Sequence, residues 1–114
     1  RGPSRKNRKG SIMQNTDFSH VTITGGLWKE KQALLRTTTA RAIYDRFRDT
    51  GRIGAFGCSW REGMPHRPHV FWDSDVAKWI EGVAYLTETK REPELDALCD
   101  DIIDNLVAHQ TADG

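Results

Sequence analysis

Two carboxylates flank a serine at Asp73-Ser74-Asp75, directly after the aromatic pair Phe71-Trp72. Short side-chain oxygens of this kind either cap a helix or bind a polar ligand such as a sugar, because they accept hydrogen bonds from backbone N–H groups and from hydroxyls. Positions i and i+2 of a helix point about 200° apart, so two helical aspartates could not share one target. We expect Asp73 or Ser74 to cap a helix and the other carboxylate to face a cavity or water.

Residues 51–70 form a second region that could do chemistry, because this stretch has no regular period yet carries large aromatic and histidine side chains. Irregular stretches of this length in compact domains are often functional. Phe56 and Trp60 could stack on sugar faces while the histidines bond hydroxyls, or the two rings could simply fill the core. His66 and His69 stand three residues apart outside any predicted helix, a spacing that favours no metal site.

The two cysteines, Cys58 and Cys99, are far apart and belong to no C-x-x-C or Cys/His ligand spacing. The sequence therefore predicts neither a zinc site nor a disulfide framework. Cys99 falls on an apolar helical face and is interpreted as a buried small hydrophobic residue.

Charge is distributed unevenly along the 114 residues, whose net charge is +1. Five basic residues with no acid among them precede an acidic body: Arg1, Arg5, Lys6, Arg8 and Lys9. We interpret residues 1–12 as a disordered basic tail or non-native leader and residues 13–114 as one folded unit. Nucleic-acid binding by the tail is the weaker alternative. No apolar run is long enough for a bilayer and no signal peptide is visible, which predicts a cytoplasmic protein without a membrane partner.

The elements that must position these residues are mainly helices. A short extended segment is predicted at residues 20–24, followed by a helix over 27–50 that ends at Gly51. Residues spaced by four predict the buried stripe of this helix: Leu35, Thr39, Ile43 and Phe47. A run of β-branched threonines in the same stretch lowers its helix propensity.

Two further helices are predicted, over residues 73–89 and from Pro93 onward. Each carries an apolar stripe, and a connection of only a few residues makes them an antiparallel αα-hairpin. The pairing leaves Trp79, Tyr85 and Ile103 without enough partners, which indicates a larger helical array. The fold class is thus all-α.

Several stretches, taken in order, resemble the N-terminal part of glycoside hydrolase family 127, the β-L-arabinofuranosidase family. They are Val-Thr-Ile-Thr-Gly-Gly-Leu-Trp-Lys-Glu at 21–30, Asp-Thr-Gly-Arg-Ile at 49–53, Phe-Trp-Asp-Ser-Asp-Val-Ala-Lys-Trp-Ile-Glu at 71–81, Pro-Glu-Leu at 93–95 and Gln-Thr-Ala-Asp-Gly at 110–114. The resemblance implies αα-hairpins forming the first part of an (α/α)6 barrel, truncated at residue 114. It also implies retaining hydrolysis by a cysteine nucleophile held on zinc, with a glutamate as acid/base.

The catalytic cysteine and glutamate of that family lie beyond this chain, so the sequence predicts no catalytic residue, no metal ligand and no bound zinc here. What the resemblance carries over is a rim of the carbohydrate pocket, for which the candidate substrate-binding residues are Trp72, Asp73, Asp75 and His69. The alternative from another class is a small helical protein-binding module whose partner surface is Phe71, Trp72 and Trp60.

Overall fold

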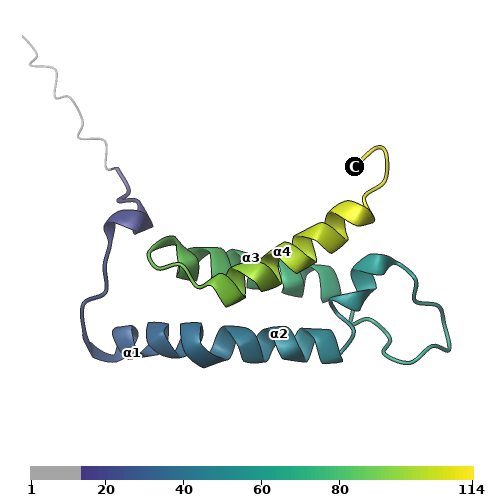
Figure 1. Ribbon diagram of the computed structural model, residues 1–114, viewed down its shortest axis with the longest axis horizontal. Helices are drawn as coiled ribbons and strands as arrows, with labels where there is room; N and C mark the ends of the chain where they lie inside the picture. The colour runs from purple at the N-terminus through teal and green to yellow at the C-terminus, as the bar shows by residue number, and fades with distance from the viewer. Residues whose placement is uncertain (1–13) are drawn as a thin grey trace, which may run out of the picture.

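The computed structural model describes residues 14–114, and every regular element in that range is helical. Figure 1 shows a long helical rod along one side of the molecule and a pair of helices on the other. The rod consists of α1 (Gly26–Leu34), η2 (Leu35–Thr39) and α2 (Ala40–Asp49), and the pair of α3 (Trp72–Glu88) and α4 (Pro93–Ala108). The 3-10 turns are η1 (Phe18–His20) and η3 (Gly54–Gly57). The predicted all-α fold is confirmed for this range.

The predicted helix over 27–50 is present, but it widens into one π-helical stretch, η2, at the threonine run. The hydroxyl of Thr37 donates to the carbonyl of Ala33 at 2.9 Å, a back-bond that β-branched hydroxyl residues make at the expense of regular helix geometry. A π turn holds more residues than an α turn, so the side chains after it face a different direction.

The apolar stripe predicted for this helix is consequently wrong in part. Ala40 is buried and Tyr44 and Phe47 pack against the core, whereas Leu35 and Ile43 stay exposed. A stripe drawn with a constant spacing of four residues ignores the change in side-chain direction at the π-helical stretch η2.

Gly51 ends α2 as predicted. Its φ of +77° lies in the left-handed region, which glycine adopts without a steric penalty. The N–H of Gly51 donates to the carbonyl of Arg48 at 3.1 Å, and the N–H of Arg52 donates to that of Phe47 at 2.9 Å. This pair of bonds is a Schellman motif, which satisfies carbonyls that the last helical turn leaves free.

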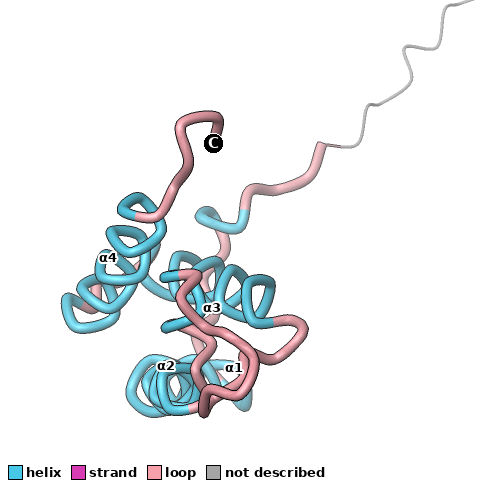
Figure 2. The backbone as a smooth tube through the Cα atoms, turned by 90° about the vertical axis from the view of Figure 1, so that its right-hand side faces the viewer, coloured by secondary structure: helices cyan, strands magenta, loops and turns pink. Residues whose placement is uncertain are grey.

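The helices α3 and α4 form the predicted hairpin, with α3 beginning and ending one residue earlier than expected. Pro93 lies in the first turn of α4, where its missing N–H costs no helical bond. In Figure 2, the α1–α2 rod lies at the bottom, and α4 and α3 lie beside each other above it. Their buried side chains, together with one from α2, make the core: Ala40, Val76, Trp79, Val83, Leu95 and Ile102.

Trp79 finds the partner that the sequence did not reveal. Its indole N–H donates to the carbonyl of Ala40 at 2.8 Å, and its ring centroid lies 5.4 Å from that of Tyr44. Trp79 thus needs a partner from outside the hairpin, as predicted, and α2 supplies it. The other two residues of that prediction, Tyr85 and Ile103, remain 53% and 42% exposed.

Arginines from the rod hold the turn between α3 and α4. Arg36 donates to the hydroxyl of Thr89 and to the carbonyl of Lys90, both at 3.1 Å. Arg41 forms an ion pair with Glu94. These contacts fix the hairpin turn against the middle of the rod.

The segment before α1 is less regular than predicted. His20 belongs to η1, whose N-cap Asp17 accepts a bond from the Ser19 N–H at 2.9 Å, and the Ser19 hydrogen bonds lower the pKa of that carboxyl. Val21 is extended, but residues 21–24 pair with no strand in the described part of the chain. The predicted tail, residues 1–12, lies outside the described residues. Among the described helices, none combines the length and apolar character needed to cross a bilayer.

Candidate functional site

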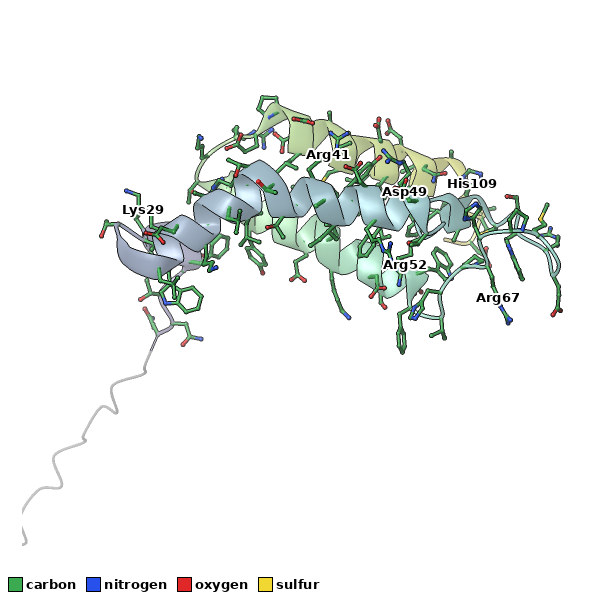
Figure 3. The ribbon with its side chains drawn as sticks, turned by 90° about the horizontal axis from the view of Figure 1, so that it is seen from below. Lys29, Arg41, Asp49, Arg52, Arg67 and His109 are labelled. Atoms are coloured by element: carbon green, nitrogen blue, oxygen red, sulfur yellow. The ribbon has the colours of Figure 1, made fainter. Side chains whose placement is uncertain are left out.

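The candidate residues gather at one end of the molecule, where the loop after α2, the first turn of α3 and the last turn of α4 meet. Figure 3 places Arg52, Arg67 and His109 at this end and Lys29 at the opposite end. The amide of Asn105 in α4 donates to the carbonyl of Ile53 at 3.5 Å, which ties α4 to the loop.

The first turn of α3 differs from the predicted cap. The helix begins at Trp72, and its N-cap is Phe71, which makes no side-chain cap bond. The N–H of Asp75 already donates to the carbonyl of Phe71 at 2.9 Å, so Asp73 and Ser74 are inside the helix instead of in front of it. Among residues 14–114, Asp73 accepts a bond only from the adjacent Ser74 N–H, at 2.7 Å.

Both aspartates are therefore helical, and they face different surroundings, as the helix geometry requires. Asp75 forms an ion pair with Arg52, with 2.9 Å between Oδ2 and Nε. Arg52 also donates to the Thr50 hydroxyl at 2.8 Å and lies over the Phe47 ring, 5.4 Å from its centroid. Asp75 thus joins the end of α2 to the start of α3.

Asp73 and Trp72 line two adjoining hollows that share Phe56 and Leu106, and we call these the Phe56 hollows. The first has a volume of about 300 Å³ and is lined by Asp73, Ser74, Ala77 and Ile80 besides the shared pair. The second, of about 460 Å³, adds Trp72, Cys58, Val107, His109, Gln110, Thr111 and Gly114. Phe56 and Trp72 meet edge to face, with 4.7 Å between ring centroids.

The loop over residues 58–71 is held mainly by its own contacts. The indole N–H of Trp60 donates to the carbonyls of Met64 and Pro65 at 3.3 and 3.2 Å, and Arg67 lies 5.8 Å from the Trp60 ring centroid. Phe56 and Trp60 were predicted either to fill the core or to contact a ligand. Phe56 packs against the core, and Trp60 holds its own loop together through the bonds to Met64 and Pro65.

Outside the hollows, His69 accepts a bond from the N–H of Phe71 at 3.2 Å through Nδ1, and no other described residue bonds its Nε2. Of the four predicted binding residues, the structure brings Trp72 and Asp73 to the Phe56 hollows. Asp75 and His69 line neither of them.

The sequence reasoning missed His109, which lines the second hollow from the end of α4. Its Nδ1 donates to the carbonyl of Asn105 at 2.8 Å, because a carbonyl oxygen only accepts. Thr111, on the same wall, donates to Asp113 at 2.8 Å, and this bond lowers the pKa of the Asp113 carboxyl. The only feature of the sequence that could have indicated His109 and Thr111 is that both follow directly after the end of a helix.

Metal ligands do not converge in the part of the chain that the structure describes: residues 14–114 contain no group of three or more His, Cys, Asp or Glu side chains able to hold an ion. Burial, with Asp96 and Asp100 nearby, raises the pKa of the half-buried Cys99 thiol to about 11. Cys58 is exposed. A nucleophilic or metal-bound sulfur must be a thiolate, and the surroundings of Cys99 disfavour one.

Chemically, the Phe56 hollows can bind but lack the groups for glycoside cleavage. Ring edges and apolar side chains suit the C–H faces of a sugar, while Asp73, Ser74 and His109 offer acceptors and donors to hydroxyls. Hydrolysis of a glycosidic bond usually takes a pair of catalytic groups across the bond. Among side chains, the lining of the two hollows includes a single carboxylate, that of Asp73.

Comparison with known proteins gives a consistent family. A family model described as beta-L-arabinofuranosidase, GH127 catalytic domain, matches residues 20–114. A non-reducing end beta-L-arabinofuranosidase of Bifidobacterium longum subsp. longum is 49% identical over 45 residues, which is 40% of this chain and 7% of the relative. The matched stretch thus spans a small part of that relative's length. No solved structure matches the chain.

Proposed function

The chain belongs to the GH127 beta-L-arabinofuranosidase family, and from this premise we propose that it is the N-terminal part of a glycoside hydrolase acting on β-linked L-arabinofuranosides or related furanosides. The observation that carries the proposal is the match of the catalytic-domain model over residues 20–114, nearly the whole described range. The helical fold is compatible with the first hairpins of an (α/α)6 barrel.

Within this function, the Phe56 hollows form part of the rim of the sugar pocket. Trp72 offers an aromatic side chain and Asp73 a carboxylate that no described side chain of another element engages. The hydrogen bond between a sugar hydroxyl and an ionised carboxylate is stronger than a neutral one. Asp75 contributes by keeping the first turn of α3 in place through Arg52, and His69 lies on the adjacent loop with its Nε2 free to approach the sugar.

Retaining hydrolysis with a zinc-bound cysteine as nucleophile completes the proposal, and these groups come from residues outside this chain. Zinc would supply a thiolate at neutral pH, because coordination deprotonates a bound thiol. The described residues do not fit that role, since their carboxylates, imidazoles and thiols form no ligand cluster and the pKa of Cys99 is raised.

Hydrolysis of an aryl β-L-arabinofuranoside, measured together with zinc content, tests the proposal. We expect the 114-residue chain to release no phenol and to hold no stoichiometric zinc. The same chain extended by the coding sequence that follows Gly114 should hydrolyse the substrate with retention, and Asp73→Asn in the extended protein should raise KM. Turnover by the short chain, or an extended protein inactive on furanosides, would overturn the proposal.

A further inference from the structure

A hollow larger than either of the Phe56 hollows lies away from them, between the N-terminal segment, the rod and α3. We call it the α2–α3 groove, and its volume is about 710 Å³. Its walls are mostly apolar: Leu35 and Ile43 come from the rod, and Tyr85 and Leu86 come from α3. Phe18, from the N-terminal segment, also lines the groove and meets Tyr85 edge to face, with 4.9 Å between ring centroids.

The apolar walls of this groove are open to solvent. Leu35 is 39% exposed and Ile43 is 38% exposed, although both belong to the apolar pattern of the rod. Contiguous exposed apolar surface of this kind marks an interaction site, because water solvates it poorly. The part of the chain that the structure describes has seven buried apolar side chains and fifteen large apolar side chains that remain exposed.

Gly82, in the floor of the groove, has no structural explanation within the described chain. It lies in the middle of α3 with a helical φ, where glycine destabilises a helix relative to alanine. A Cβ added at Gly82 would meet nothing within 4 Å. The glycine therefore leaves a strip of bare backbone at which another segment can approach closely.

The charges at the groove are basic. Arg36 and Lys78 are the charged side chains of its lining. Arg36 already bonds Thr89 and Lys90, whereas Lys78 takes part in no ion pair among residues 14–114. An occupant with an acidic flank next to its apolar stripe would complement this lining.

We infer that the α2–α3 groove is the docking site of an amphipathic, acid-flanked helix from the part of the same catalytic domain that this chain lacks. The inference rests on the proposed function, and the 7% coverage of the arabinofuranosidase relative supports it, because most of such an enzyme lies outside the matched stretch. A second copy joined groove to groove fits less well, since it would bring Lys78 and Arg36 toward the same basic pair.

Substitution of Gly82 by leucine tests this inference, because it should raise the Tm of the 114-residue chain and lower the Tm of the extended chain. In the 114-residue chain, Gly82→Leu has open space and better helix propensity, so the Tm should rise by about 4 °C. In the chain extended past Gly114, the new side chain would occupy the space of the docked helix. The Tm should then fall, and arabinofuranoside hydrolysis should drop more than tenfold. Ala97→Leu, an exposed site on α4, is the control and should change the activity of the extended protein less than twofold.

The inference fails if Gly82→Leu stabilises the extended protein as it does the short chain, or if the coding sequence stops at Gly114. It also fails if the short chain forms a dimer that Gly82→Leu dissociates, since the occupant would then be a second copy. An extended protein that folds but hydrolyses no furanoside overturns the proposed function alone, because the sign of the Tm change still reports on the docking.

Discussion

The two faces of α3 differ in how well the described chain covers them. On the inner face, Val76, Trp79 and Val83 are at most 6% exposed, and the Trp79 indole donates to the Ala40 carbonyl in α2. Trp79 and Val83 also border the α2–α3 groove, so the two faces adjoin. On the groove face, Tyr85 is 53% exposed and Gly82 has open space in front of it. One side of α3 is thus covered by other helices, and the other side is exposed to solvent in the described structure.

This difference separates the contacts that fold the chain from the surface that, under the proposed function, faces the rest of the catalytic domain. The inner face joins α2, α3 and α4 into one small core, and the Arg52–Asp75 ion pair fixes the end at which the Phe56 hollows lie. The groove face adds little to that core, because its apolar side chains still face water. Substitutions on the inner face should therefore act in the short chain, and those on the open face should act only once the rest of the domain is present.

Removing the Trp79 side chain should give the largest effect. Trp79→Ala should lower the free energy of unfolding by about 3–5 kcal/mol, because it leaves a cavity and strips the Ala40 carbonyl of its donor. Urea unfolding followed by circular dichroism measures the loss. Trp28→Ala is the matched control, since Trp28 is 69% exposed and should lose under about 0.5 kcal/mol. Equal losses for the two tryptophans would contradict the inner core.

A smaller effect is expected for the two aspartates of α3. Asp75→Asn removes a partly shielded ion pair with Arg52 and should cost about 1 kcal/mol in the short chain. Asp73→Asn keeps an oxygen that accepts from the Ser74 N–H and loses only an exposed charge, so it should leave the unfolding midpoint nearly unchanged. In the extended protein, Asp73→Asn should raise KM while Asp75→Asn shifts the Tm. The reverse assignment would show that Asp75 contacts the sugar and Asp73 does not.

The smallest predicted effect concerns the two thiols. Burial raises the pKa of Cys99 from 9.0 to about 11, so its thiolate is scarce at pH 8, whereas Cys58 is exposed. A disulfide reagent should label Cys58 first. In a Cys58→Ser variant, labelling of Cys99 should accelerate nearly tenfold per pH unit between pH 8 and 10. The raised pKa stabilises the fold below pH 9, and this contribution disappears as the pH approaches 11. A rate independent of pH would contradict burial of Cys99.

Local signals in the sequence predicted much of the fold. Gly51 and Pro93 mark helix boundaries by backbone chemistry that depends on few neighbours, and the structure has both as predicted. The predicted helix cap at Asp73 or Ser74 was wrong, because the N-cap is Phe71. Carboxylates are common both at the N-cap and in the first turn of a helix, so the sequence alone does not distinguish these two positions. The partner of Trp79 was missed because Ala40 lies 39 residues away, on a helix whose stripe η2 had rotated.

Of the residues predicted for the candidate site, Trp72 and Asp73 line the Phe56 hollows, but the sequence did not reveal the surfaces that complete these hollows. Phe56 and His109 reach them from a loop and from the end of α4, and no periodicity connects such positions. The prediction of a carbohydrate ligand came from the family resemblance. The structure distinguishes the two aspartates, because Asp75 pairs with Arg52 and Asp73 lines a hollow.

Side-chain oxidation by hydroxyl radicals is the most direct measurement of the difference between the two faces of α3. Trp79 should be protected in both the 114-residue chain and the chain extended past Gly114. Tyr85, Leu35 and Ile43 should react readily in the short chain and become protected in the extended one. Equal reactivity of these three side chains in both proteins would contradict an open face that the rest of the catalytic domain covers.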